Sequence, residues 1–189
     1  QRILREASDA TFNTLNVDGA TSTNDTAMLF ASGKRGPCDL DEFARAVRAA
    51  CDDLTMQMAR DAEGMTRIAR LTVTGAASDS EAKIAAKNIA ENNLVKCSWY
   101  GGDPYWGRLL AAAGSCGVDL DVARSAVSYG GIKVADGGVG IPHDGQALAE
   151  HMMGEEIAIE VHLGAGSGSA RVIGIDLGPG YIKENSKTS

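Results

Sequence analysis

The chain has 189 residues, of which 44% are hydrophobic and 23% charged, a composition typical of a globular domain with a core of its own. Its net charge of −7 argues against nucleic acid or an anionic membrane surface as the main partner. The sequence contains no apolar run near the ~20 residues that a membrane span needs, and it opens on no signal peptide. These features predict a protein that binds neither nucleic acid nor membranes.

The first third of the chain predicts two helices with strands and a polar segment between them. Residues 1–10 are typical of the end of a helix, and residues 12–17 alternate as in a strand with one polar face. Residues 27–31 form a short apolar run that predicts a buried strand. A long amphipathic helix follows over about residues 39–61, with an aspartate able to cap its start.

The middle of the chain predicts two strands and two helices. Residues 68–76 alternate as in a strand, and residues 81–92 carry a buried helical face behind a serine- and aspartate-rich cap. Residues 94–100 predict a further strand. A third internal helix is expected over residues 103–114, because Asp-Pro is a favourable helix start and glycine a favourable end.

The last third predicts mainly strands. Within residues 125–150, two glycine pairs separate short strands. Residues 156–163 and 171–177 alternate cleanly, and the glycine-rich residues 164–169 between them predict a hairpin connection rather than a phosphate-binding loop, since no Lys-Ser/Thr follows. A final short strand is expected at residues 181–182.

Taken together, these elements predict an α/β fold with a mixed, largely antiparallel sheet packed with helices. No linker or internal repeat divides the sequence. Residues 1–189 are therefore expected to form a single domain.

The cysteines bear on metals and on the redox compartment. Their spacings match neither a zinc motif nor a redox motif, and the three histidines are scattered. We therefore predict no metal site, and reduced, mostly buried thiols in a cytoplasmic protein. The cysteines are Cys38, Cys51, Cys97 and Cys116.

Two polar segments are candidates for a functional site. Residues 18–26 hold four hydroxyls, one amide and two carboxylates without a bulky apolar side chain, which suits either a surface turn or the wall of a polar site. Asp61 and Glu63 lie at the end of the long helix, where the helix dipole disfavours negative charge. They are either solvated or bind the amino group of a substrate.

Several motifs, in order along nearly the whole chain, resemble the ornithine acetyltransferase family, also called glutamate N-acetyltransferases, of the arginine biosynthesis J type. The best match is Arg-Asp-Ala-Glu-Gly-Met-Thr-Arg at residues 60–67, where the family has Arg-Asp-Gly-Glu-Gly-Ala-Thr-Lys. The other matching segments are residues 11–13, 17–26, 72–76, 94–96, 102–112, 176–177 and 181–185.

The resemblance implies a self-processing fold of the N-terminal-nucleophile kind and a ping-pong acetyl transfer. In this family a threonine at the start of the β-chain takes acetyl from N2-acetylornithine and gives it to glutamate, its α-amine serving as base. The chain resembles that β-chain, with the nucleophilic Thr expected before Gln1, so no catalytic residue is assigned here. No cofactor is implied. The implied partner is an α-chain from the same precursor in an α2β2 assembly.

The resemblance also implies the substrate-binding residues. Glu63 matches the family's substrate-binding glutamate, and Asn185 matches its C-terminal asparagine. Ser189 is the candidate for the last hydroxyl ligand, although it follows Asn185 by four positions and the family's hydroxyl by five. The chain also departs from the family pattern at Ala20 and Ala62, which replace Asp and Gly.

Three other functions remain open. The first is a paralogue in secondary metabolism that transfers acyl groups between other amino acids, for which Ala20, Ala62 and the altered tail after Asn185 leave room. The second is a non-catalytic member acting as a binding module. The third is an aminopeptidase of a related self-cleaving class, which would hydrolyse peptides without acetyl transfer.

Overall fold

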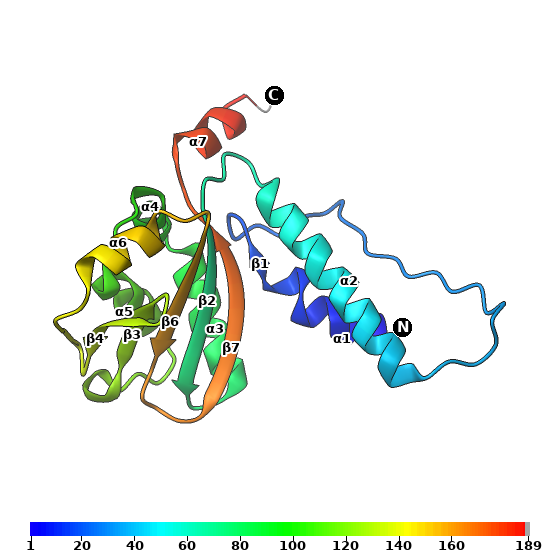
Figure 1. Ribbon diagram of the computed structural model, residues 1–189, viewed down its shortest axis with the longest axis horizontal. Helices are drawn as coiled ribbons and strands as arrows, with labels where there is room; N and C mark the ends of the chain where they lie inside the picture. Colours follow the sequence, from blue (N-terminus) through cyan, green and yellow to red (C-terminus); the bar gives the residue numbers. More distant parts are fainter. Residues whose placement is uncertain (188–189) are drawn as a thin grey trace.

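The computed structural model describes residues 1–187 and centres on one seven-stranded sheet (Figure 1). The strand order is β1-β7-β2-β6-β3-β4-β5. Two pairs are parallel, β1 with β7 and β2 with β6, and the other four are antiparallel. The predicted mixed, largely antiparallel sheet is therefore confirmed. The strands are β1 (Leu15–Asn16), β2 (Ile68–Ala76), β3 (Ala126–Tyr129), β4 (Ile132–Asp136), β5 (Val139–Gly140), β6 (Glu156–His162) and β7 (Gly168–Ile175).

The helices divide into two groups. α1 and α2 pack against each other beside the sheet, on the side of β1, whereas α3 lies on β2 and β7 (Figure 1). α4 and α5 contact α3, α6 contacts β3, and α7 follows the end of β7. The helices are α1 (Arg2–Ala10), α2 (Leu40–Arg60), α3 (Asp79–Glu91), α4 (Asn93–Gly101), α5 (Trp106–Gly114), α6 (Gly145–Met152) and α7 (Pro179–Asn185), with short 3-10 turns at Phe12–Thr14 and Val122–Arg124.

Small side chains bring α3 and α4 close to the sheet. The face of α3 that covers β2 and β7 is mostly alanine and fully buried. Trp99 on α4 is also fully buried, and its ring lies over Gly174 of β7. A Cβ atom at Gly174 would stand 2.6 Å from the Trp99 ring. The glycine therefore makes the space that the indole fills.

Gly174→Ala is expected to lower the free energy of unfolding by about 1–3 kcal/mol, because the added methyl overpacks the Trp99 ring. Chemical denaturation of the variant and the parent protein measures this difference. Gly101→Ala at the end of α4 is the control, since a Cβ there meets no atom within 4 Å. A Gly174→Ala protein as stable as the control would show that the ring has room to move.

The predicted helix starts are confirmed for two helices. The Asp39 side chain caps α2 by accepting from the amides of Asp41 and Glu42, and Ser78 caps α3 by accepting from Glu81. The helix expected over residues 103–114 ends as predicted but begins only at Trp106, without a side-chain cap.

Three predicted strands are wrong, and so is the strand expectation for residues 145–150, which begin α6 behind a cap from Asp144. Residues 94–100 form α4, because the Asn92 side chain caps the amides of Leu94 and Val95. Residues 181–182 belong to α7, whose first residue is a proline. Residues 27–31 form no regular structure and are exposed, because no strand of the sheet pairs with them.

The predicted hairpin at residues 164–169 is also wrong. β2 lies between β6 and β7, so their connection crosses the end of β2 instead of turning back on a neighbour. The amides of Ala165 and Gly166 donate to the Gly75 carbonyl at 2.7 and 2.8 Å and fix this crossing. Residues 12–17 are only partly a strand, with a 3-10 turn preceding the two residues of β1.

The cysteines are all unpaired thiols, but the expectation that they are mostly buried is wrong. Cys51 is buried between α1 and α2, Cys116 is half-buried, and Cys38 and Cys97 are exposed. Cys38 lies in the exposed segment directly before α2. Among residues 1–187, no helix is both long and apolar enough to span a membrane.

Candidate functional site

The sheet brings three polar segments together at one edge. β2 is antiparallel to β7, with Ile68 opposite Ile175, so the turn before β2 and the segment after β7 lie at the same edge. β1 runs parallel to β7, so the residues that follow β1 leave at that edge too. The residues that meet there come from positions 17–18, 61–67 and 176–185 (Figure 1).

Glu63 and Asn185 meet at this edge, although they are 122 positions apart. The Asn185 side-chain amide donates to Glu63 Oε2 at 3.3 Å and to the Tyr181 carbonyl at 3.1 Å. Glu63 lies in the turn between α2 and β2, and Asn185 is the last residue of α7. The structure therefore places two of the predicted substrate-binding residues in contact. The third, Ser189, lies outside the described residues.

Two glycines allow the turn and α7 to touch. Gly64 has a φ of +67°, and a Cβ atom there would lie 2.1 Å from the Tyr181 amide nitrogen and 2.3 Å from the Gly180 carbonyl carbon. Only glycine permits this approach of one backbone to another. The packing of α7 against the turn, and therefore the position of Asn185, depends on Gly64 and Gly180.

A second link joins α7 to the segment after β1. The Tyr181 hydroxyl donates to Asp18 Oδ2 at 2.9 Å. Burial, the bond to Asp18 and the charge of Glu63 raise the pKa of Tyr181, so the hydroxyl stays a neutral donor between two carboxylates. The sequence analysis treated Asp18 only as part of a polar segment and expected Tyr181 in a strand. The hydrogen bond between these two residues was therefore not predicted.

Asp176 anchors the third segment. This carboxylate is 3% exposed and accepts from the Thr66 amide at 2.9 Å, the Thr66 hydroxyl at 2.5 Å and the Arg67 amide at 3.1 Å. It thereby ties the residues after Gly64 to the residue after β7. The sequence offered no signal for this role beyond the family-like Asp-Leu at residues 176–177.

Two hollows border the site. The smaller has a volume of about 240 Å³, and its polar lining includes Asp18, Glu91, Lys96 and Tyr181. The larger, about 1790 Å³, lies between residues 12–29 and α2, and its wall includes both Asp18 and Glu63.

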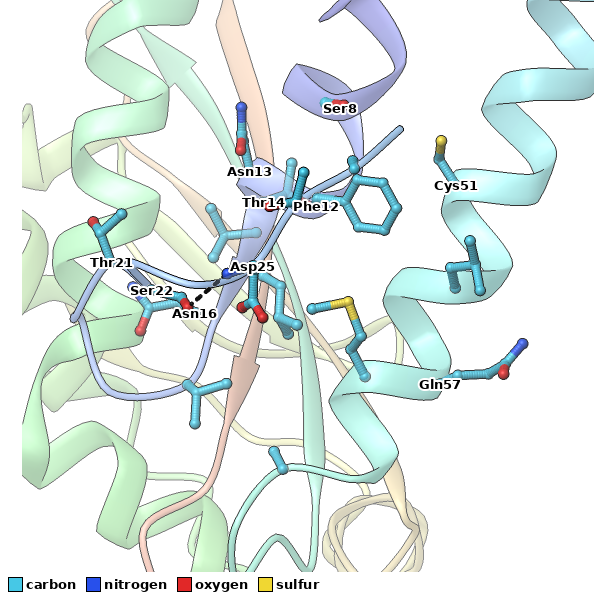
Figure 2. A pocket seen from close by; sticks show the side chains of 18 of the residues that line it. Ser8, Phe12, Asn13, Thr14, Asn16, Thr21, Ser22, Asp25, Cys51 and Gln57 are labelled. Carbon is cyan, nitrogen blue, oxygen red and sulfur yellow. Dashed lines mark hydrogen bonds between the residues drawn. The ribbon is translucent and has the colours of Figure 1, made fainter. Parts of the chain in front are cut away.

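The larger hollow has walls of different character. In Figure 2 the Phe12 ring projects toward α2, the helix that carries the lining residues Cys51 and Gln57, and Thr21, Ser22 and Asp25 lie along the polar segment. The segment also makes local turn bonds, such as those from the Asn24 and Asp25 amides to Ser22 Oγ. Residues 18–26 are thus both a surface turn and the wall of a hollow.

The arrangement suits the binding of an amine. Two carboxylates, Glu63 and Asp18, line the larger hollow, and each accepts a hydrogen bond, from the Asn185 amide and the Tyr181 phenol respectively. An ammonium group gains charge-assisted hydrogen bonds from such oxygens. Among the described residues, no group of three His, Cys, Asp or Glu side chains is placed to hold a metal ion.

The chain resembles known proteins over its whole length. A family model described as "ArgJ family" matches residues 1–189. The arginine biosynthesis bifunctional protein ArgJ of Mycolicibacterium paratuberculosis is 47% identical over 190 residues, which cover 98% of this chain and 46% of that protein. The glutamate N-acetyltransferase Oat2 of Streptomyces clavuligerus is 38% identical, covering 98% of this chain and 49% of that protein.

A solved structure supports the same relation. The crystal structure of the arginine biosynthesis bifunctional protein ArgJ from Bacillus halodurans superposes with a TM-score of 0.92 at 34% identity, covering 98% of this chain and 91% of that chain. The predicted fold class is thereby confirmed. The chain spans about half the length of the curated relatives that it matches.

Proposed function

The chain belongs to the ArgJ family, and we propose that it forms part of an acetyltransferase that moves acetyl from N2-acetylornithine to glutamate. The products are ornithine and N-acetylglutamate. The observation that carries this proposal is the contact between Glu63 and Asn185, because two side chains matched independently to substrate-binding positions converge at one edge of the sheet.

The chemistry follows a ping-pong route. A threonine hydroxyl outside this chain attacks the acetyl carbonyl of N2-acetylornithine, the amide bond breaks, and the ornithine amine leaves with a proton. The amine of glutamate then attacks the acetyl ester and restores the hydroxyl. Glu63 and Asn185 are proposed to bind and orient each amino acid so that its acetyl group or amine reaches the threonine.

The partner is proposed to be an α-chain from the same precursor, in an α2β2 assembly in the cytoplasm. The relatives' greater length supports a shared precursor, since each is about twice as long as the part that matches this chain. The exposed apolar side chains of Met28 and Phe30, 68% and 85% exposed, leave surface for such a partner to cover.

Ala62 both lines the larger hollow and packs on the core. Its side chain packs against the apolar cluster formed by Met56, Ala59, Ile68 and Ile175, beneath the turn that holds Glu63. The methyl group that replaces the family's glycine hydrogen therefore adds to this core contact. The paralogue reading therefore keeps Ala20, Ala62 and the altered tail after Asn185 as its grounds.

The test is transfer by the complete gene product, incubated with N2-acetylornithine and glutamate without added coenzyme. We expect ornithine and N-acetylglutamate to appear in equal amounts. No transfer by a properly self-cleaved protein would overturn the ornithine–glutamate assignment. Transfer between other N-acyl amino acids would favour the paralogue, and peptide hydrolysis alone would favour the aminopeptidase.

A further inference from the structure

Lys96 is a buried charge at the centre of the three converging segments. It lies on α4, is 3% exposed, and lines the smaller hollow. Its ammonium group donates a short hydrogen bond to the Val17 carbonyl, directly before Asp18. A lysine is seldom buried this far unless its charge is paired.

The groups that face Lys96 come from four elements. Asp176 follows β7, Asp18 follows β1, and Glu91 ends α3, while Cys97 is the next residue on α4. The charges of these groups favour the protonated form, but burial outweighs them and lowers the pKa of Lys96 from 10.5 to about 8. The hydroxyl of Tyr181 borders the same hollow as a neutral donor. Lys96 is therefore mostly charged near pH 7 and loses its charge a little above it.

The carbonyl that Lys96 binds and the two carboxylates whose charges act on it all lead to the Glu63–Asn185 pair. Val17 carries Asp18, which accepts from the Tyr181 hydroxyl one turn before Asn185 in α7. On the other side, Asp176 holds the backbone of Thr66 and Arg67, which continues the turn containing Glu63. In addition, the Leu177 amide donates to the carbonyl of Lys96 itself at 3.3 Å.

We propose that Lys96 is a positioning residue for substrate binding, holding the segments after β1 and β7 together so that Glu63 and Asn185 keep their places. It acts through its bond to the Val17 carbonyl and its attraction for the charges of Asp18 and Asp176, and it does not itself touch the substrate. The inference deepens the proposed function and rests on it for the identity of the substrate.

The first test compares Lys96→Met with the parent in the complete gene product. We expect the KM for glutamate to rise roughly 10- to 100-fold, because displaced Glu63 and Asn185 side chains lose charge-assisted bonds to the substrate, with a smaller fall in kcat. Lys96→Arg, which keeps the charge, should recover part of the loss. Lys133→Met, on β4 at the far side of the sheet, is the matched control and should leave KM unchanged.

The pH dependence separates positioning from a merely structural role. Lys96 is charged below about pH 8, so its attraction for the Asp18 and Asp176 carboxylates is present there and is lost as pH rises through about 8. We therefore expect the KM advantage of the parent over Lys96→Met to shrink above pH 8. Groups common to both proteins cancel in this ratio. A constant ratio, with only a lowered melting temperature, would overturn the proposal.

Hydrogen exchange supplies a readout that needs no activity. In Lys96→Met, the amides of residues 17–20 and of α7 should exchange faster, while those of β2 stay unchanged. If Lys96→Met does not fold, Tyr181→Phe is the second variant, because it removes the bond from the Tyr181 hydroxyl to Asp18. We expect its KM for glutamate to be several-fold higher than that of the parent. Because Lys96 is still present, its KM should still change as pH rises through about 8. Unchanged exchange and KM in these variants would overturn the role of Lys96. An inactive parent would overturn the proposed function instead, and exchange would still decide the inference.

Discussion

Gly64→Ala is expected to lower kcat/KM for acetyl transfer by roughly 100-fold, the cost of displacing a binding group by about 1 Å. The added Cβ would stand 2.1 Å from the Tyr181 amide nitrogen and 2.3 Å from the Gly180 carbonyl carbon. Both atoms are backbone, so no side-chain rotation relieves the collision. α7 must move away from the turn, and Asn185 then leaves Glu63.

Steady-state kinetics of the complete gene product measures this effect. Gly131→Ala is the matched control, because Gly131 also has a positive φ, +79°, but a Cβ there meets no atom within 4 Å. Both variants carry the backbone strain of an alanine at positive φ, about 1–2 kcal/mol, and only Gly64→Ala carries the collision. Equal activity of the two variants would show that the seating of α7 does not position the site.

The sequence predicted the central strands well, for a physical reason. β2 and β6 each bury one face, so their apolar residues alternate over seven or more positions, and this period belongs only to strands. Residues 94–100 show no such alternation. This short run is apolar enough for a strand or a helix, and the Asn92 cap, a local contact outside the run, decides for helix α4.

The site was predictable only in part. Glu63 and Asn185 could be named because they match a motif, and the structure adds that they touch. Their meeting depends on β2 and β7 being neighbours, which strand periodicity does not specify, since it leaves strand order open. The links from Lys96 to Val17 and from Tyr181 to Asp18 rest on the same topology, so no local pattern could reveal them.

Glu63→Gln is the second variant with a large expected effect. The substitution keeps the size of the side chain and its contact with Asn185 but removes the negative charge. If Glu63 binds the amine of the substrate, the loss is that of a hydrogen bond to a charged group, about 1.5–3 kcal/mol. This corresponds to a roughly 10- to 150-fold fall in kcat/KM.

The same assay with both substrates varied in turn measures this fall. Asp61→Asn is the comparison, because Asp61 is the other exposed carboxylate that the sequence named as a candidate for the amine and lines the larger hollow with Glu63, but takes no part in the contact with Asn185. Its neutral form changes the net charge of the turn by the same amount, so a general electrostatic effect would appear in both variants. A loss confined to Glu63→Gln assigns the amine contact to that one carboxylate. Equal and small losses would instead show that the turn attracts the substrate only through its overall charge, and that the ligand for the amine lies elsewhere.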